Sequence, residues 1–221
     1  MKLRALAPFL LQGTLWWVVA KPVFLLFTRF TVRGYEHVAN RQAPIIFAPN
    51  HSHPLDSVLL PLALPLWSKY SPLFYVVKES SRYSAWRKVL FTIFNLRLIG
   101  AIPFEHNKKD YALSLNRHVQ LLKNGASLCI FPEGKFTETG KMGDVHGGVS
   151  YLSSTSNIDV VPTLIQGTFH LTLFDFLTRR RTVTIEFFPP VPAGQVQLIL
   201  NEGRSYKEAA AIIMQNVTKV C

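Results

Sequence analysis

The sequence has few cysteines, few acidic residues, and neither an internal repeat nor a low-complexity stretch. Its two cysteines, one of them the last residue, give no disulfide framework and no metal-ligand spacing. Only 13 Asp and Glu oppose 24 Lys and Arg, for a formal net charge of +11. No zinc-finger spacing or RNA-recognition signature accompanies this charge, which argues against a nucleic-acid-binding protein.

Hydrophobic residues are plentiful instead. They make up 48% of the 221 residues, aromatic residues make up 12%, and the mean hydropathy is +0.19. A chain of this length forms a hydrophobic core without disulfides, most simply as one domain. An apolar excess combined with scattered positive charge predicts contact with an anionic membrane surface. A basic face that is merely solvated is the alternative.

Residues 1–28 form the most apolar part of the chain and are predicted to associate with a membrane. The apolar run at 5–20 is interrupted by Gln12-Gly13, and Lys21-Pro22 follows it. The run is shorter than the ~20 residues of a spanning helix, and a proline inside a helix breaks it. We therefore expect two helical pieces lying in one leaflet, with the Trp16-Trp17 pair at the interface. A true span and a signal peptide are the alternatives.

Residues 29–221 alternate between short apolar segments and segments with helical periodicity. This order predicts one α/β domain whose mixed, largely parallel sheet is flanked by helices. The functional residues of such sheets gather at the carboxyl ends of the strands. The predicted strands are 29–35, 44–48, 74–77, 98–104, 127–131, 160–166 and 182–188, and the predicted helices begin at Asp56 or span 82–95, 110–124 and 205–217.

The most informative pattern follows the second predicted strand, in the run Asn50-His51-Ser52-His53-Pro54-Leu55-Asp56. A histidine followed by an aspartate five residues later can act as a general base and the carboxylate that orients it. Histidine suits this task because its ordinary pKa of about 6.5 lies near neutrality. His51 and His53 also form a metal-like pattern, but no third ligand follows at a suitable spacing. We expect no metal here, and a metal-dependent hydrolase is a minor alternative.

Two further elements strengthen this interpretation. Each overlaps or follows a predicted strand, and they read Gly100-Ala101-Ile102-Pro103-Phe104-Glu105-His106 and Phe131-Pro132-Glu133-Gly134-Lys135. Together with the H-x4-D spacing, they resemble the glycerolipid acyltransferases, the family of lysophosphatidic acid acyltransferases. The H-x4-D and F-P-E-G elements are specific as a pair, and the resemblance extends over residues 29–193, most of the chain.

The resemblance implies a role for each motif residue. His51 is the catalytic base and Asp56 its partner, and the enzyme supplies no nucleophile. His106 and Phe136 stand where the family carries arginines, so nearby lysines are expected to supply the positive charge. Glu133 has a second interpretation, as a purely structural carboxylate. The residues expected to bind the acceptor are Gly100, His106, Lys108, Glu133, Gly134 and Lys135.

The resemblance also implies the reaction. We expect a membrane-associated O-acyltransferase that moves a fatty acyl chain from acyl-CoA or acyl carrier protein to a lysophospholipid. The default acceptor is 1-acylglycerol-3-phosphate, which gives phosphatidic acid, and no cofactor is expected. The expected location is the cytoplasmic face of a membrane, the inner membrane in a bacterium. The alternatives are another lysolipid or an aminolipid acceptor, and a non-catalytic membrane-surface protein.

Overall fold

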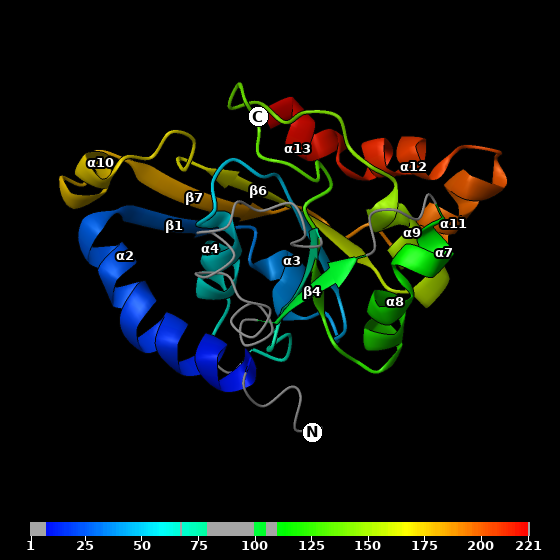
Figure 1. Ribbon diagram of the computed structural model, residues 1–221, viewed down its shortest axis with the longest axis horizontal. Coiled ribbons are helices and arrows are strands. Elements are labelled where there is room, and N and C mark those ends of the chain that lie inside the picture. Colours follow the sequence, from blue (N-terminus) through cyan, green and yellow to red (C-terminus); the bar gives the residue numbers. More distant parts are fainter. Residues whose placement is uncertain (1–7, 67, 79–99, 105–109, 221) are drawn as a thin grey trace, which may run out of the picture.

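The computed structural model describes residues 8–66, 68–78, 100–104 and 110–220. Within these residues one sheet is covered by helices on both faces, in a three-layer arrangement (Figure 1). The strands are β1 (Arg29–Arg33), β2 (Ile46–Pro49), β3 (Phe74–Lys78), β4 (Ala101–Phe104), β5 (Leu128–Cys129), β6 (Val160–Gln166) and β7 (Thr182–Phe187). The helices are η1 (Leu11–Ala20), α2 (Lys21–Phe27), α3 (Glu36–Ala39), α4 (Asp56–Ala63), α7 (Tyr111–Ser114), α8 (Asn116–Lys123), α9 (Gly148–Ser156), α10 (Leu173–Leu177), α11 (Ala193–Asn201), α12 (Tyr206–Ile213) and α13 (Gln215–Val220).

The strands lie in the order β1-β7-β6-β2-β5-β3-β4. Among these strands the pair β6–β7 is antiparallel, and the other neighbouring pairs are parallel. The predicted mixed, largely parallel sheet is therefore confirmed. The carboxyl ends of β2, β5 and β6 meet at one edge of the sheet. Because β1 is parallel to β7, it runs against β2 and begins at this same edge.

The central strand β2 shows how the sheet divides the core into two layers. All four of its residues are buried, and their side chains alternate between the two faces. Phe47 packs in the cluster that includes α2, α3 and α4, whereas Ile46 and Ala48 pack in the cluster of α8, α9 and α11 to α13. A strand covered on both faces needs an apolar run rather than an alternating one, and Ile46-Phe47-Ala48-Pro49 supplies it.

The amino-terminal helix is continuous from Pro8 to Phe27, so the predicted break at Lys21-Pro22 is wrong. Pro22 lies in the first turn of α2, where the π-helical register of η1 gives way to the α-helical one. A missing N–H is tolerated best in a first turn. Of the described helices, this one is long and apolar enough to cross a membrane by length and composition, with 20 residues and a hydropathy of 1.5.

Two contacts fasten this helix to the domain. Gln12 is buried, and its side-chain amide forms two hydrogen bonds with the backbone of Leu73, just before β3. The amide nitrogen donates to the Leu73 carbonyl at 2.7 Å, and the Leu73 N–H donates to the amide oxygen at 2.7 Å. Phe24 lies in the core near the other end of the helix. The helix therefore lies along the domain with one apolar side exposed, which includes Val18 and Leu26.

Several elements differ from their predictions. The predicted helix at 110–124 is divided at Leu115 into α7 and α8, and α3, α9, α10 and α11 were not predicted. The strand predicted at 127–131 is reduced to the two residues of β5. The helix predicted at 82–95 lies outside the described residues. The strand predicted at 160–166 matches β6 at both ends.

Candidate active site

Asn50 fixes the point at which the chain leaves β2. Its side-chain nitrogen donates to the Ile165 carbonyl at 3.0 Å, and the Ile165 N–H donates to its side-chain oxygen at 2.7 Å. Asn50 is buried, so these two bonds satisfy its amide where water does not reach. The side chain thus pairs with β6 as a backbone peptide would. It positions the next residue, His51, at the carboxyl edge of the sheet.

His51 and Asp56 meet as the sequence predicts. His51 Nδ1 lies 3.1 Å from Asp56 Oδ2. The same Oδ2 accepts the backbone N–H of Ser52 at 2.7 Å and of His53 at 2.8 Å. Asp56 is fully buried, whereas the His51 side chain keeps 16% of its exposure. Three donors on one oxygen fix the carboxylate, and the carboxylate in turn fixes the imidazole, which leaves His51 Nε2 for a substrate.

The loop after β5 holds the backbone of His51 from both sides. The His51 N–H donates to Glu133 Oε1 at 2.8 Å, and the His51 carbonyl accepts the Thr137 N–H at 2.8 Å. Each contact joins residues more than 80 positions apart, so the sequence did not predict them. The histidine is therefore fixed at its backbone as well as at its ring, as a preorganised catalytic group must be.

Two aromatic rings of the same loop cover the imidazole. The Phe131 ring stacks on His51 with centroids 3.8 Å apart and an interplanar angle of 19°. The Phe136 ring lies 4.2 Å away, tilted by 50°, and is 46% exposed. Phe136 occupies one of the positions where the resembling family carries arginine. The surroundings of His51 are thus apolar on the side where an arginine was expected.

Glu133 is buried, and both of its oxygens are engaged. Oε1 accepts the His51 N–H, and Oε2 accepts the Gly143 N–H at 2.8 Å. The carboxylate joins the loop that carries His51 to the loop at 141–148. This geometry matches the structural interpretation of Glu133 that the sequence left open. Its predicted contact with the acceptor stays a prediction.

Gly134 and Lys135 differ in how closely they approach the site. Gly134 has a positive φ of 63°, and a Cβ there would lie 3.2 Å from the His146 ring, so a glycine suits this turn. Lys135 is exposed, and its Nζ lies 3.4 Å from Glu138 Oε1. The lysine expected to replace an arginine is therefore paired at the surface, and Phe136 follows it in the chain.

The structure does not bring Gly100 to His51. Gly100 lies at the amino end of β4, at the opposite edge of the sheet, and its N-terminal neighbours are not described. A Cβ there would lie 2.6 Å from the Leu73 carbonyl oxygen, so the close packing of two backbones requires glycine. His106 and Lys108, the other residues predicted from this element, lie outside the described residues.

Sequence reasoning missed Thr168 and His118. Thr168 is fully buried beyond the end of β6, and its Oγ1 lies 2.9 Å from Ser52 Oγ. His118 of α8 is also fully buried, and its Nε2 lies 3.1 Å from the Ile102 carbonyl. Burial lowers the pKa of His118 to about 4, so this ring is neutral at neutral pH. Thr168 and Ser52 lie 116 residues apart, so no local signal predicts their contact.

Two other reactive side chains near the site, those of His53 and Cys129, are hydrogen-bonded or buried. His53 Nδ1 accepts the Leu55 N–H at 3.2 Å, and burial lowers the pKa of His53. Burial, with a smaller contribution from the Asp56 charge, raises the pKa of the Cys129 thiol well above its usual value, which disfavours a thiolate nucleophile. In the described part of the chain, no three His, Cys, Asp or Glu side chains cluster in a way that could hold a metal ion.

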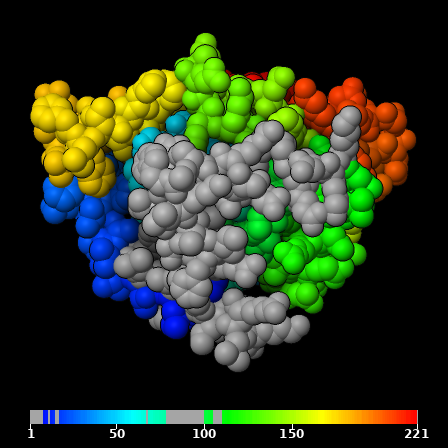
Figure 2. Space-filling model, in the orientation of Figure 1, coloured from blue at the N-terminus to red at the C-terminus, as the bar shows by residue number. Residues whose placement is uncertain are grey.

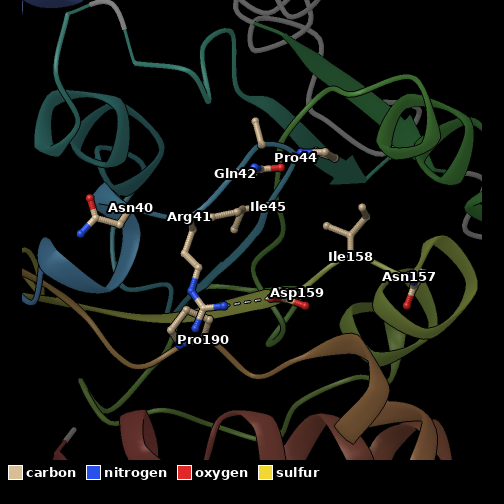
Figure 3. Close-up of a pocket in the computed structure, with 10 residues that line it drawn as sticks. Asn40, Arg41, Gln42, Pro44, Ile45, Asn157, Ile158, Asp159 and Pro190 are labelled. Atoms are coloured by element: carbon tan, nitrogen blue, oxygen red, sulfur yellow. Dashed lines mark ion pairs between the residues drawn. The ribbon is translucent and has the colours of Figure 1, made fainter.

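A cavity of about 440 Å³ lies at the opposite edge of the sheet, before β2 and β6 begin. Figure 3 shows Arg41 reaching across it to Asp159, with 3.7 Å between Nη1 and Oδ2. Asp159 Oδ1 also accepts the Ala193 N–H at 3.1 Å. The cavity lining includes no histidine, cysteine or lysine, so it lacks a group that could exchange a proton near neutrality.

Comparison with known proteins gives a consistent result. A family model described as Acyltransferase matches residues 29–166. The chain is 23% identical over 186 residues to 1-acyl-sn-glycerol-3-phosphate acyltransferase LPAT1 of Arabidopsis thaliana, covering 81% of this chain and 48% of that one. It is 27% identical over 124 residues to a probable 1-acyl-sn-glycerol-3-phosphate acyltransferase of Mycoplasma pneumoniae, covering 56% and 44%. The chain spans about half the length of the curated relatives it matches.

A solved structure has a similar fold. It is the crystal structure of the 1-acyl-sn-glycerophosphate acyltransferase PlsC from Thermotoga maritima, with a TM-score of 0.63 and 19% identity. The similarity covers 100% of this chain and 83% of that one. At this identity the likeness supports the fold: the mixed sheet, its flanking helices and the apolar amino-terminal helix.

Proposed function

This chain belongs to the acyltransferase family, and on that basis we propose that it transfers a fatty acyl chain from a thioester to a hydroxyl group of a lysophospholipid. The default acceptor is 1-acylglycerol-3-phosphate, which the names of the relatives support. The observation that carries the proposal is the 3.1 Å contact between His51 Nδ1 and the fully buried Asp56 Oδ2. It leaves the second ring nitrogen of a partly exposed histidine available as a general base.

The proposed reaction begins with the acceptor hydroxyl at His51 Nε2. As the hydroxyl oxygen attacks the thioester carbonyl carbon, its proton passes to Nε2, and Asp56 stabilises the imidazolium that forms. The tetrahedral intermediate collapses by breaking the carbon–sulfur bond. The departing thiolate takes the proton back from Nε2, which leaves a new ester, a free thiol and a neutral histidine. No enzyme nucleophile is needed, in keeping with the burial of Cys129.

The acyl donor is acyl-CoA or acyl carrier protein. The phosphate groups of the one and the acidic surface of the other suit a chain with a net charge of +11. The apolar rings of Phe131 and Phe136 beside His51 give the first carbons of an acyl chain an apolar surface to contact.

Residues 1–28 are assigned to membrane association, and residues 29–221 to acyl transfer. The exposed apolar side of the Pro8–Phe27 helix supports this division, since water is an unfavourable solvent for it. The buried bonds of Gln12 to Leu73 tie the helix to the catalytic domain along its side. They favour a helix that lies in one leaflet over one that crosses the bilayer alone. We assign the cytoplasmic face, where acyl-CoA and acyl carrier protein are found.

One observation favours a second candidate, an acceptor without a phosphate near the reacting hydroxyl. Phe136 covers the imidazole where an arginine was expected, and Lys135 is paired with Glu138. A phenylalanine cannot hold a phosphate, whereas it tolerates a neutral lysolipid or an aminolipid. If this candidate is correct, Phe136→Arg shifts the acceptor preference toward lysophosphatidic acid by about tenfold or more, the value of one charge-assisted hydrogen bond.

The experiment that tests the proposal is acyl transfer by the purified protein in mixed micelles. Labelled acyl-CoA and acyl carrier protein are offered with lysophosphatidic acid, neutral lysolipids and aminolipids, to the native protein and to His51→Ala. We expect transfer to lysophosphatidic acid that falls by about 10²–10⁴-fold in the variant. Transfer to another acceptor only would support the second candidate. No transfer by folded protein with either donor would overturn the proposal in favour of a non-catalytic membrane-surface protein.

A further inference from the structure

The short helix α10 exposes apolar side chains that no core explains. Leu173, Phe174 and Leu177 are 73%, 60% and 51% exposed. Phe176 faces inward instead, with its ring 5.3 Å from that of Phe24 and 5.5 Å from that of Phe27. Large apolar side chains that project together into solvent are unfavourable unless another apolar phase covers them.

The helix is held in this conformation. Thr172 and Asp175 form a capping box, in which the Thr172 hydroxyl accepts the Asp175 N–H and the Asp175 carboxylate accepts the Thr172 N–H. A cap of this kind stabilises the first turn of a helix too short to persist alone. The apolar side chains are therefore presented by a fixed element rather than by a frayed end.

A basic segment follows the apolar one at once. Arg179, Arg180 and Arg181 come directly after α10, and the Arg180 guanidinium lies 4.8 Å from the centre of the Phe174 ring. Arg181 Nη2 lies 3.9 Å from Asp175 Oδ2, so the acidic residue of this surface already has a basic partner. Apolar side chains beside a cluster of arginines match the two layers of an anionic membrane surface, acyl chains below and phosphates above.

This surface continues the amino-terminal helix and lies at the edge of the sheet that carries His51. The contacts of Phe176 with Phe24 and Phe27 place α10 against α2, whose Leu25 and Leu26 are exposed. Figure 2 shows the yellow atoms around α10 directly next to the blue atoms of the helix, on one side of the molecule. The segment that connects β6 to α10 begins at this same edge. It includes Thr168, which contacts Ser52, the neighbour of His51.

We propose that α10 and residues 179–181 form a second membrane contact, which inserts Leu173, Phe174 and Leu177 among lipids and pairs the arginines with the phosphates of an anionic bilayer. This inference rests on the proposed membrane association of residues 1–28, because both contacts use the same bilayer. The arginines complement the negative charge of an anionic bilayer, and the apolar side chains of α10 continue the exposed apolar side of α2. Both observations indicate that a bilayer covers this surface. Two contacts, at α2 and at α10, fix the carboxyl edge of the sheet relative to the membrane, so that a lipid acceptor reaches His51 without leaving the interface.

The test measures partition of the purified full-length chain onto vesicles of phosphatidylcholine alone and of phosphatidylcholine with phosphatidylglycerol. The apolar variant carries Leu173→Ser, Phe174→Ser and Leu177→Ser, and its matched control carries Leu113→Ser and Leu198→Ser, which are 59% and 64% exposed on α7 and α11. The charge variant carries Arg179→Gln, Arg180→Gln and Arg181→Gln, and its control removes the same charge through Lys123→Gln, Arg204→Gln and Lys219→Gln. Thermal unfolding checks that each variant is folded.

We expect the apolar variant to lose at least about tenfold in partition onto both vesicles. The charge variant loses about fivefold per arginine on anionic vesicles only, and both controls lose little. Amide hydrogen exchange of residues 172–181 in the native protein slows on anionic vesicles, a readout that needs no variant.

Equal losses of partition in variants and controls, or unchanged hydrogen exchange on bound vesicles, would overturn the α10 contact while leaving the amino-terminal helix as an anchor. Absence of any vesicle binding would instead overturn the proposed membrane association. Self-association that the apolar variant abolishes, with vesicle binding unchanged, would assign this surface to a second copy of the chain.

Discussion

Strand β2 has a basic side chain paired with an aspartate near each end, and the two pairs differ in burial. At the carboxyl end, His51 lies 3.1 Å from Asp56, which is fully buried. At the amino end, Arg41 lies 3.7 Å from Asp159, and these side chains are 51% and 35% exposed. A buried carboxylate interacts strongly with its partner, whereas water and ions screen an exposed pair. The same two-residue arrangement thus has a proposed catalytic role at one edge of the sheet and a modest structural role at the other.

The partners differ as well as the burial. Arginine keeps its charge at all ordinary pH values, whereas a histidine gains and loses a proton near neutrality. Asp56 also accepts two backbone N–H groups, so its position is fixed before a substrate arrives. A fixed carboxylate beside an imidazole is an arrangement that can orient a general base.

The largest expected effect compares Asp56→Asn with Asp159→Asn. In the first variant the amide oxygen can still accept the backbone N–H groups of Ser52 and His53, but the side chain carries no charge to stabilise the His51 imidazolium. We expect the rate of acyl transfer to fall by at least about 10²-fold while the protein stays folded. Asp159→Asn should leave the rate within about twofold, because it changes a screened pair at the other edge. Comparable losses in the two variants would remove the distinction between the two edges.

The next prediction concerns His118, a buried imidazole that lacks a carboxylate partner among the described residues. Burial lowers its pKa to about 4, below the value of about 6.5 expected in the unfolded chain. The unfolded state therefore binds more protons between pH 6.5 and 4, and stability falls as the pH falls through this window. The fall should be roughly 3 kcal/mol in the free energy of unfolding.

Denaturant unfolding of the native protein and of His118→Leu at several pH values measures this effect. The variant should lose that part of the pH dependence, since leucine binds no proton. A native protein whose His118-dependent stability rises as the pH falls would contradict the neutral, buried ring.

A smaller effect is expected from Glu133→Gln, compared with Glu138→Gln in the same loop. The glutamine amide keeps one acceptor oxygen, so the N–H of either His51 or Gly143 loses its partner in a buried site. We expect a loss of about 1–3 kcal/mol in stability and a lower rate, because His51 is less well held. Glu138 is 83% exposed, so its variant should change neither quantity measurably. Chemical denaturation and the transfer assay measure both, and an effect of equal size at the two positions would refute the bridging role of Glu133.

The smallest effect is expected at the amino edge. Arg41→Gln removes the ion pair with Asp159 and should reduce stability by less than about 1 kcal/mol. The rate of acyl transfer should stay unchanged, because the cavity that Arg41 crosses lies at the far end of β2. A marked loss of activity in this variant would show that the two edges are coupled.

The sequence predicted those parts of the molecule whose signals are local. Apolar runs predicted the strands, with β6 matching at both ends, and the motifs predicted the family, which the comparisons confirm. The H-x4-D spacing, read together with the companion motifs, predicted that His51 and Asp56 act as a pair, and the two side chains meet at 3.1 Å. The comparable local signal at Lys21-Pro22 misled, because Pro22 lies where the π-helical register of η1 gives way to the α-helical register of α2 and the helix continues.

The helix α9 shows why the remainder was harder to predict. Its sequence, Gly148-Val149-Ser150-Tyr151-Leu152-Ser153-Ser154-Thr155-Ser156, is rich in serine and looks like a loop. In the structure the serine hydroxyls donate to backbone carbonyls, such as Ser150 to Tyr206 and Ser153 to Ile158. A polar segment can therefore be buried when its hydroxyls find carbonyl partners. Most of these partners are local, but Tyr206 lies 56 residues from Ser150, and a partner at that distance has no local signature. The bridge of Glu133 and the contact of Thr168 with Ser52 were missed for the same reason.

The measurement that tests the central claim most directly is a double-mutant cycle of His51→Ala and Asp56→Asn. The quantity measured is kcat/KM for acyl transfer to the preferred acceptor. If Asp56 acts through His51, Asp56→Asn slows the native protein but has no further effect once His51 is alanine, so the double variant is no slower than His51→Ala alone. Losses that multiply, or a His51→Ala variant that keeps the native rate, would contradict the assignment of this pair as the catalytic base and its partner.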